Sequence, residues 1–427
     1  MKDVIHDWNP WWNSNDQIRS LKGVDRGAYL DGLKDLLPKR HIISLPGIRR
    51  SGKTTIMYQL IEHLLKDNPP ENICYMNMDD ERLAGLDDPL ETFLKEYRRN
   101  MTPEGRVYLF LDEIQSIHDW ERWLKRYYDL GKDMKFVISG SFSSLLSSDY
   151  SHLLTGRNIS MKIDPLSFGE YLSFKGLDMR YGDNDIIWRV HRDDEDLLIH
   201  HLEAYMKTGG FPEVVRSEEG PDLLKQYFND ILYRDIIKRH HIRFPEKLEL
   251  LAVYSLRNHS NIMSLRRIGK ASGLSPDTVN EYMYYLEQAF LIFRSRLYSR
   301  STLEGTRTNL PMKIYSTDLG MANSLMLEPM DTFGRWAENL LAKKVEKELG
   351  HCFYWREKRE VDILIPDHRI AMQVNYGRPR ENEISAFGDM PYRDFEKVLV
   401  TRDQYSTDKD VKKVPLWVRL LSDGWRT

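Results

Sequence analysis

The sequence GIRRSGKT at Gly47–Thr54 gives the clearest indication of the fold of the N-terminal half. It fits the pattern GxxxxGK[ST], in which glycines let the backbone amides turn inward around an anion. An apolar segment at 41–46 precedes it, and apolar residues recur at helical spacing through Lys53–Leu65 after it. The positive end of a helix that starts there favours phosphate. The sequence therefore predicts a phosphate-binding loop between a buried strand and a helix.

This loop assigns a role to several residues. We expect the Lys53 ammonium to reach the β- and γ-phosphates of a nucleotide, and the Thr54 hydroxyl to bind Mg²⁺. The predicted cofactors are therefore ATP and Mg²⁺. The residues expected to surround the phosphates are Gly47, Ile48, Arg49, Arg50, Ser51, Gly52, Lys53, Thr54 and Thr55.

A second half of the site is expected at Asp112–Glu113, after the apolar strand Val107–Leu111. Two carboxylates at the end of a buried strand cost desolvation free energy, which favours a functional role over a surface turn. We expect Asp112 to hold Mg²⁺ through water and Glu113 to polarise the water that attacks the γ-phosphate. A predicted strand at 73–78 lies between the two motifs, which indicates an NTPase with an extra strand between them.

Further candidates follow the next strands. Ser141 is predicted to lie beside the γ-phosphate, with Ser139 as the alternative, although both serines are also compatible with a simple turn. Arg157 is predicted to complement transition-state charge, from its own or a neighbouring subunit, and a plain surface arginine is equally open. Strands separated by helical segments imply a doubly wound parallel sheet. The predicted strands are 41–46, 73–78, 107–111, 136–139 and 159–163.

Composition limits the protein class. The 427 residues suggest about three domains, and 10 Trp, 23 Tyr and 15 Phe exclude a disordered chain. With 62 basic against 65 acidic residues, no global positive charge indicates nucleic acid. Cys74 and Cys352 belong to no metal motif, and we interpret both as small buried side chains in a reducing compartment. Without a signal peptide or a long apolar stretch, we expect a cytoplasmic protein with no membrane partner.

The C-terminal half changes character after about residue 172. Gly273 separates two predicted helices, Ser275 is placed as an N-cap, and Pro276 suits the first helical position. A strand-like segment at 290–298 follows, which suggests a winged helix. The predicted domains are 1–172 (P-loop domain with an N-terminal extension), 173–240 (helical connector), 241–304 (winged helix–turn–helix) and 305–427 (small α/β domain).

Motifs along the whole chain also resemble a known family. They are GIRRSGKTT (47–55), LDEIQ (111–115), ISGSFSSLL (138–146), LTGR (154–157), DPLSFGEYL (164–172), GGFPE (209–213), RDII (234–237), KIYSTDLG (313–320), GRWAENL (334–340) and YWREKREVD (354–362). Over about residues 20–400 this ordered set resembles the archaeal and bacterial AAA-like P-loop ATPases with a C-terminal DUF4143 domain. The resemblance implies an ASCE-type P-loop core, a winged helix and a region similar to PD-(D/E)XK, or restriction-endonuclease-like, nucleases.

The nuclease-like motif is incomplete in this sequence. Such a site needs carboxylates around a metal and a lysine that orients water or steadies the phosphate. Glu338 and Asp362 match the acids, but Gln373 and Asn375 stand where Glu and Lys are required. Glu360 lies on the same face of a strand as Asp362 and can lend charge, but it cannot replace the lysine. We expect no nuclease activity, and a retained fold that serves as a structural or binding module.

The sequence thus predicts an ATPase that forms ADP and phosphate and couples its nucleotide state to movement of the C-terminal domains. A nucleotide-gated switch with slow turnover and a DNA-processing factor are the alternatives. The presumed recognition helix at 275–289 carries Asp277, Glu281 and Glu287, which makes a poor major-groove face. DNA and a protein both remain candidate partners, and the oligomeric state is open. The basic residues that could contact DNA phosphates are Arg266, Arg267, Lys270, Arg294, Arg296, Arg300 and Arg307.

Overall fold

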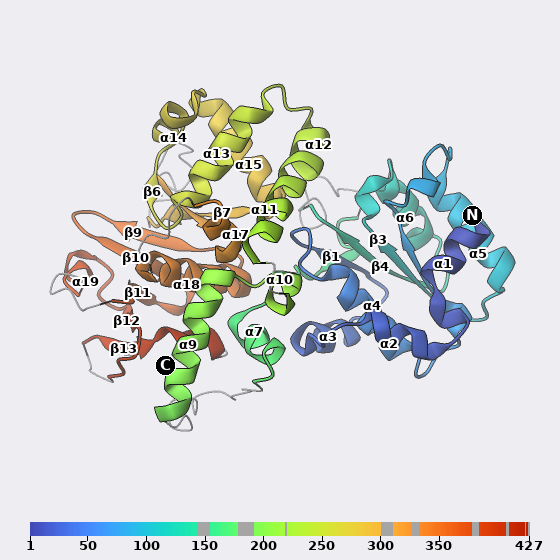
Figure 1. Cartoon of the computed structure of the whole chain (residues 1–427), viewed down its shortest axis with the longest axis horizontal. Helices are drawn as coiled ribbons and strands as arrows, with labels where there is room; N and C mark the ends of the chain where they lie inside the picture. The colour runs from blue at the N-terminus through green and yellow to red at the C-terminus, as the bar shows by residue number, and fades with distance from the viewer. Residues whose placement is uncertain are drawn as a thin grey trace. The chain divides into compact units, whose positions relative to one another are not determined.

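The computed structural model forms two compact units (Figure 1). Unit 1 comprises Met1–Asp164 with Gln288–Phe290, and unit 2 comprises Pro165–Glu287 with Leu291–Thr427. The structure describes residues 1–142, 154–177, 192–217, 220–299, 311–326, 333–377, 384–406, 410–422 and 424–425.

Unit 1 contains a parallel five-stranded sheet with the order β2-β3-β4-β1-β5. This confirms the predicted α/β core. The strands are β1 (Ile42–Pro46), β2 (Ile73–Asn77), β3 (Val107–Asp112), β4 (Met134–Gly140) and β5 (Asn158–Ser160). Past β5, hydrogen bonds from Met161 N to Ser44 O and from Ile163 N to Pro46 O keep the chain alongside β1. The strand predicted at 159–163 therefore extends beyond β5, which ends at Ser160.

Both faces of this sheet are covered, as a doubly wound fold requires. Leu109 and Leu111 pack into a core with residues of α5 and α6, whereas Phe110 packs on the other face with residues of α3 and α4. Because successive side chains of a strand point to opposite faces, β3 is almost purely apolar from Val107 to Leu111 before its last residue, Asp112. The helices of unit 1 are α1 (Lys2–Trp8), α2 (Ile18–Leu21), α3 (Gly27–Lys34), α4 (Lys53–Leu64), α5 (Pro89–Met101) and α6 (Trp120–Asp129).

The extra strand between the two motif strands is not the one that the sequence suggested. The strand inserted between β1 and β3 is β4, whereas the predicted candidate at 73–78 is β2, at the edge of the sheet. The prediction of an inserted strand is right, but its identity was wrong. The physical reason is that a crossover can skip a position that a later strand fills, so order along the chain does not fix order in the sheet.

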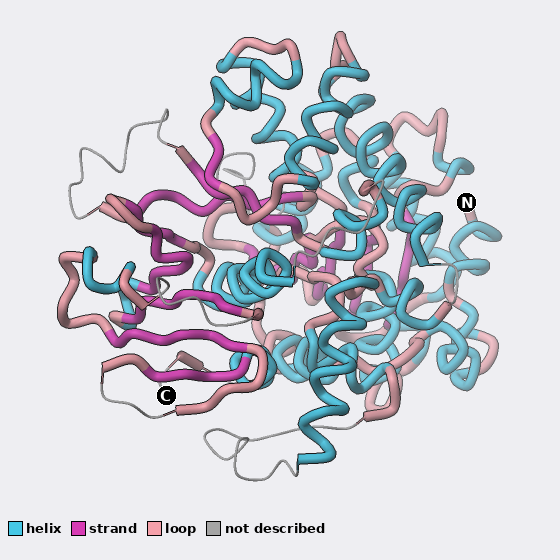
Figure 2. The backbone as a smooth tube through the Cα atoms, turned by 60° about the vertical axis from the view of Figure 1, so that its left-hand side comes forward, coloured by secondary structure: helices cyan, strands magenta, loops and turns pink. Residues whose placement is uncertain are grey.

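Unit 2 is built on a mixed eight-stranded sheet, visible among the magenta strands of Figure 2, with the order β13-β12-β11-β10-β9-β7-β8-β6. The strands are β6 (Ile262–Met263), β7 (Ile292–Leu297), β8 (Met312–Ser316), β9 (Phe353–Arg356), β10 (Glu360–Ile365), β11 (Ile370–Asn375), β12 (Glu396–Thr401) and β13 (Lys412–Pro415). Strand β7 pairs with β8 and also with β9, so it links the two halves of the sheet.

The helices of unit 2 include the predicted helix–turn–helix. Gly273 ends α14 in the left-handed conformation at φ 65°, and Ser275 Oγ accepts a hydrogen bond from Thr278 N at 3.2 Å, as an N-cap does. The helical segments are α7 (Phe168–Phe174), α9 (Arg192–Thr208), α10 (Pro212–Arg216), α11 (Gly220–Asp230), a π-helix (Ile231–Ile237), α12 (Lys238–His240), α13 (Pro245–Arg257), α14 (Leu265–Ser272), α15 (Pro276–Gln288), α17 (Leu319–Ser324), α18 (Phe333–Leu349), α19 (Ala386–Asp389) and α20 (Leu416–Leu421).

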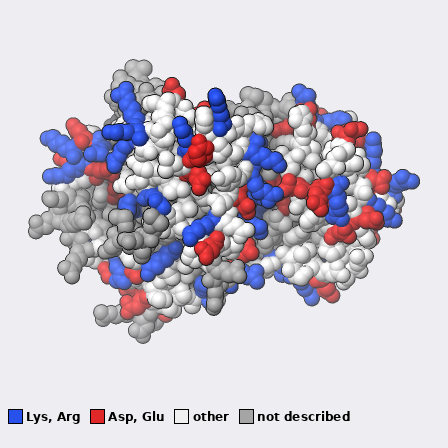
Figure 3. All heavy atoms as spheres, turned by 45° about the horizontal axis from the view of Figure 1, so that its top comes forward, with Lys and Arg blue, Asp and Glu red and all other residues white. Residues whose placement is uncertain are grey.

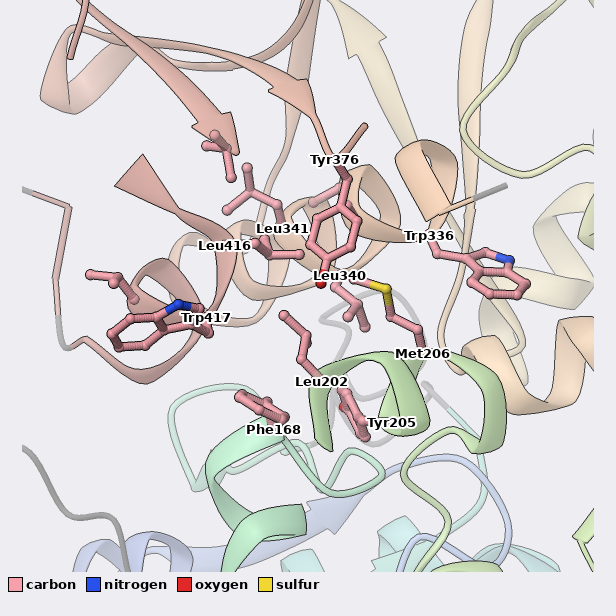
Figure 4. Packing of buried hydrophobic residues seen from close by; sticks show 14 of the residues in the cluster. Phe168, Leu202, Tyr205, Met206, Trp336, Leu340, Leu341, Tyr376, Leu416 and Trp417 are labelled. Carbon is pink, nitrogen blue, oxygen red and sulfur yellow. The ribbon is translucent and has the colours of Figure 1, made fainter. Parts of the chain in front are cut away.

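One hydrophobic core joins segments that the sequence placed in different domains. Leu202 and Met206 of α9 pack with Leu340 and Leu341 of α18 and with Trp417 of α20 (Figure 4). The segment predicted as a connector at 173–240 therefore shares a core with the segment at 305–427. The predicted boundary at 304/305 also falls between β7 and β8, which are hydrogen-bonded to each other. These boundaries do not separate independent cores, and the four-domain division stays a prediction.

Two smaller expectations concern cysteines and membranes. Cys74 and Cys352 are both buried thiols without a disulfide, as predicted. In the part of the chain that the structure describes, no helix has both the length and the hydropathy needed to cross a bilayer.

Candidate nucleotide site

The phosphate loop connects β1 to α4, as its sequence predicts. Arg50 and Gly52 take positive φ values of 69° and 96°, which turn the chain sharply before Lys53 starts the helix. At Gly47 any side chain would overlap the backbone carbonyl of Ile163, so only glycine fits there. The loop is thus held against the segment that follows β5.

Lys53 lies inside this loop. The residue is 5% exposed, and its Nζ donates to the carbonyl oxygens of Gly47 at 3.0 Å and Ile48 at 3.2 Å. A buried ammonium needs such partners. These hydrogen bonds hold the charge at the place where the motif requires it.

Asp112 and Thr54 are in direct contact. Thr54 Oγ1 donates to Asp112 Oδ2 at 2.5 Å, and the carboxylate, 1% exposed, also accepts hydrogen bonds from Tyr75 and Ser139. Hydroxyl and carboxylate oxygens are the ligands that Mg²⁺ prefers. The two residues predicted to share the metal, 58 positions apart in the sequence, therefore fit that role.

Glu113 follows with a left-handed backbone, at φ 50°. Gln115 Nε2 donates to its carboxylate at 2.5 Å. Burial opposes the charge of Glu113, but the positive charges of Lys53 and Arg49, together with hydrogen bonds from Gln115 and from the Ser141 backbone, lower its pKa below the usual 4.5. Glu113 is therefore an ionised carboxylate at neutral pH, next to the charges of the phosphate loop.

The two serines at the end of β4 have different surroundings. Ser139 Oγ donates to Asp112 and accepts a hydrogen bond from Glu113 N at 3.3 Å. Ser139 therefore helps to hold the Asp112 carboxylate in place. Ser141 Oγ lies 3.4 Å from Gln115 Nε2, on the side of Glu113. Both serines are at the site, and the choice of Ser141 as the residue beside the γ-phosphate stays a prediction.

Arg157 is not brought to this site. It directly precedes β5, and its carbonyl pairs with Ile42 N at the start of β1, whereas the phosphate loop follows the other end of β1. At roughly 3.3 Å per residue, β1 separates the two positions by about 16 Å. Arg157 Nε instead donates to Asp129 Oδ1 at 2.9 Å. A role in its own subunit's site is therefore incompatible with the geometry, and only the role in a neighbouring subunit stays a prediction.

Two functional neighbours escaped the sequence analysis. Arg26, 2% exposed, donates from Nη1 to Ser51 O at 2.8 Å and from Nη2 to Asp164 O at 3.0 Å, so it supports the phosphate loop from the N-terminal extension. No sequence signal marks it, because the two hydrogen bonds that link it to the loop and to Asp164 go to backbone carbonyls. Tyr75 donates to Asp112 Oδ2 at 2.8 Å. The one signal for Tyr75 was a phenol inside a predicted buried strand, where its hydroxyl needs a partner.

Tyr75 is itself held by the N-terminal segment. The Asn9 side chain donates from Nδ2 to Tyr75 O at 2.8 Å and accepts from Tyr75 N at 2.7 Å through Oδ1. Asn9 is fully buried, and it pairs with β2, the edge strand of the sheet among the described residues. The first 26 residues thus support both halves of the site, through Asn9 and through Arg26.

Two family models match the chain. Residues 39–172 match an AAA domain, which supports an AAA-like P-loop ATPase with nucleotide binding and hydrolysis in general. Residues 199–331 match DUF8612, a domain of unknown function. The match is not to the DUF4143 family that the resemblance suggested, so that assignment and the nuclease-like fold stay predictions.

Solved structures resemble the chain only weakly. The Aeropyrum pernix ORC1 protein, solved in complex with DNA, has a TM-score of 0.32 and 15% identity, covering 70% of this chain and 91% of that one. Hsp104 of S. cerevisiae, solved in an extended complex with casein, has a TM-score of 0.34 and 17% identity, covering 64% of this chain and 52% of its own.

Relatives match most of the sequence. An uncharacterized protein of Haemophilus influenzae is 25% identical over 399 residues, covering 90% of this chain and 94% of its own. The uncharacterized protein MJ1544 of Methanocaldococcus jannaschii is 31% identical over 370 residues, covering 82% of this chain and 79% of its own. With that identity over most of both sequences, the chain belongs to the same family as MJ1544 of M. jannaschii.

Proposed function

We propose that the protein is a Mg²⁺-dependent ATPase that converts ATP to ADP and phosphate and passes its nucleotide state to its C-terminal half. The observation that carries this proposal is the contact of Thr54 with Asp112 at 2.5 Å, beside the phosphate loop and next to the ionised Glu113. A structural ion pair or turn would not need two carboxylates at a buried strand end.

The residues divide the chemistry as follows. Lys53 would exchange its loop carbonyls for phosphate oxygens. Thr54 and Asp112 would hold Mg²⁺, which would supply positive charge against the phosphates. Glu113 accepts a proton from a water molecule whose oxygen attacks the γ-phosphorus. The bond from that phosphorus to the bridging oxygen breaks, and ADP leaves with the bridging oxygen.

A path from the phosphate loop to unit 2 supports the proposed coupling. The Arg26 guanidinium joins Ser51 O, in the loop, to Asp164 O. Asp164 is the residue at which the first segment of unit 1 ends, and Pro165 starts unit 2. A shift of the loop on nucleotide binding or hydrolysis would therefore act on the backbone at the junction of the two units.

A winged helix stays part of the proposal, with different bounds. The order along the chain is α13, β6, α14, α15, β7, β8, and β8 pairs with both β6 and β7. Three helices and a small antiparallel sheet in this order are the elements of a winged helix, which then covers about 245–316. The sequence had ended it at 304, before its last strand.

DNA is the less supported partner for this segment. The Asn280 amide, one of two side chains of α15 that could read bases, accepts a hydrogen bond from Arg294 Nη1 at 3.1 Å. The same guanidinium donates from Nε to Glu287 Oε1 at 2.7 Å. Arg266, Arg267 and Lys270 of α14 are exposed, and so are Asp277 and Glu281 of α15. Figure 3 shows basic and acidic side chains interspersed on the face that it draws. Arg300 and Arg307 lie outside the described residues. We therefore propose a protein partner or an intramolecular role for this segment.

Phosphate release by the purified protein tests the function. We expect release from ATP that needs Mg²⁺, that EDTA stops, and that Lys53→Ala removes together with ATP binding. ATP binding without Mg²⁺-dependent release above the Lys53→Ala level would instead support the nucleotide-gated switch. Stimulation of turnover by added duplex DNA would support the DNA-processing alternative.

A further inference from the structure

Unit 2 contains a buried lysine surrounded by three carboxylates. Lys313 Nζ, on β8, lies 2.8 Å from Glu338 Oε1 of α18 and 3.1 Å from Asp362 Oδ1 of β10, and it also pairs with Glu360. The Lys313 side chain is 0% exposed, whereas those of Glu338 and Asp362 are each 10% exposed. The ammonium is therefore the centre of the cluster, and the carboxylates enclose it.

Other hydrogen bonds orient these carboxylates toward the lysine. Tyr315 donates its hydroxyl to Glu338 Oε1 at 2.8 Å, the same oxygen that accepts from Lys313. Val374 N donates to Asp362 Oδ2 at 2.9 Å, which leaves Oδ1 for the ammonium. The oxygens are thus fixed by neighbouring elements rather than only by the charge that they surround.

As they stand, the described residues form no group of His, Cys, Asp or Glu side chains that could hold a metal ion, yet the oxygens around Lys313 are of the kind that a divalent cation binds. Carboxylates from two elements that meet at one point, with one oxygen of each turned inward, are typical of sites for Mg²⁺ or Mn²⁺. Ile363 of β10 is paired with Met372 of β11 in an antiparallel ladder. If this pairing continued by one residue, Gln373 would lie opposite Asp362. Its buried Oε1 has no hydrogen-bond partner among the described residues. In this chain a lysine ammonium is the cation at that point.

We propose that Lys313 is a resident cation that takes the place of a metal ion in this cluster. Its single positive charge offsets part of the charge of the three carboxylates, so unit 2 keeps these side chains together without a divalent ion. With the ammonium at the centre, no metal-bound water is available for cleavage of a phosphodiester. Emptying the position should create a divalent-metal site. This proposal does not depend on the ATPase.

Burial separates this role from a catalytic one. A lysine that orients water or contacts a phosphate must reach solvent or substrate, whereas Lys313 is enclosed on all sides. An uncompensated charge in such a place strongly destabilises the folded protein. Replacing the lysine should therefore destabilise the folded protein, and a bound cation should restore its stability.

The test compares Lys313→Met with the parent chain. Both proteins carry Asp112→Asn and are measured without nucleotide, so that the phosphate-loop site contributes no metal binding. Mn²⁺ binding is measured by electron paramagnetic resonance, and melting temperature is measured with and without Mn²⁺. We expect Lys313→Met to bind one more Mn²⁺ per chain than the parent and to melt several degrees higher when Mn²⁺ is added, because a ligand that binds the native state stabilises it. The parent should show neither effect. Lys313→Met/Asp362→Asn, the matched control, should lose both.

Several results would overturn the proposal. One is a folded Lys313→Met protein that binds no additional Mn²⁺. A second is Mn²⁺ bound by the parent and lost in Glu360→Gln, a change at a partly exposed residue. A third is metal-dependent plasmid cleavage by the parent that Asp362→Asn abolishes. If Lys313→Met does not fold in EDTA, recovery of folded protein on refolding with Mn²⁺ supports the proposal, and failure to recover it contradicts it.

Discussion

At the residue scale, the fixed chemistry of the nucleotide motifs let the sequence single out candidate site residues. Lys53, Thr54, Asp112 and Glu113 were proposed because phosphate and Mg²⁺ require these residue types at set distances from a strand end, and their roles stay predictions. Arg26 could not be found, because the hydrogen bonds that link it to the loop go to backbone carbonyls, which any residue supplies. A side chain whose partner is the backbone leaves no pattern in a single sequence.

Glu113→Gln separates binding from hydrolysis. Glutamine keeps the shape of the side chain but cannot accept a proton, so ATP affinity should persist while turnover falls by roughly 10²-fold or more. Phosphate release and calorimetric ATP binding are measured side by side. Asp112→Asn is the control, because it weakens metal binding and extra Mg²⁺ should partly restore its activity. Turnover of Glu113→Gln at the unmutated rate would remove Glu113 as the base.

His259 gives unit 2 a sensitivity to acid. The ring is fully buried, and burial, with the nearby Arg335 charge, lowers its pKa to about 3. Between pH 6.5 and 3, His259 is protonated in the unfolded chain but stays neutral in the folded chain. The free energy of unfolding therefore decreases as the pH falls below 6.5. By linkage the loss between pH 7.5 and 5.5 should be about 1 kcal/mol from this group. Urea unfolding at the two pH values measures it, and His259→Gln should show a smaller difference. An equal difference in both proteins would contradict the assignment.

At the element scale, the existence of strands was easier to predict than their arrangement. Apolar runs such as Val107–Leu111 identify buried strands, because both faces of a parallel sheet are covered. The position of β4 between β1 and β3 depends on where each crossover lands, which local sequence does not specify. The sequence likewise did not predict that the N-terminal extension supports the nucleotide site, since Asn9 and Arg26 contact elements far along the chain.

The support from the N-terminal extension can be removed at one residue. Arg26→Met leaves the carbonyls of Ser51 and Asp164 without the guanidinium, and a buried group without its partner costs about 1–3 kcal/mol. We expect a lower melting temperature and weaker ATP binding. Arg19→Met is the matched control, since Arg19 belongs to the same extension and its side chain is 72% exposed. Equal ATP affinity in the two variants would show that Arg26 does not hold the loop.

At the scale of the whole molecule, composition and motif order indicated a chain of several parts, but not where its cores lie. Segments predicted as separate domains pack into one core around Leu202 and Leu341, and one sheet continues through β7. Apolar periodicity shows that a helix has a buried face but not which distant element covers it. The long-range packing in unit 2 was therefore beyond the reach of local patterns.

Coupling between nucleotide state and unit 2 should be visible where the two units meet in the sequence. Because Arg26 joins the phosphate loop to Asp164 O, ATP binding should change the backbone near Pro165, the first residue of unit 2. Amide hydrogen exchange is measured on Glu113→Gln with and without ATP and Mg²⁺, since this variant should hold ATP without consuming it. We expect altered exchange in peptides that cover 159–172 and not only in those that cover the loop.

Two comparisons make this measurement decisive. Lys53→Ala should show no change with ATP at either place, because it should not bind the nucleotide. Glu113→Gln combined with Arg26→Met, at ATP concentrations that saturate it, should keep the change at the loop and lose the change at 159–172. If the double variant responds at both places, the signal does not pass through Arg26. If exchange in Glu113→Gln changes only at the loop, the effect of ATP binding does not reach unit 2. A conformational change in unit 2 would then depend on a bound partner.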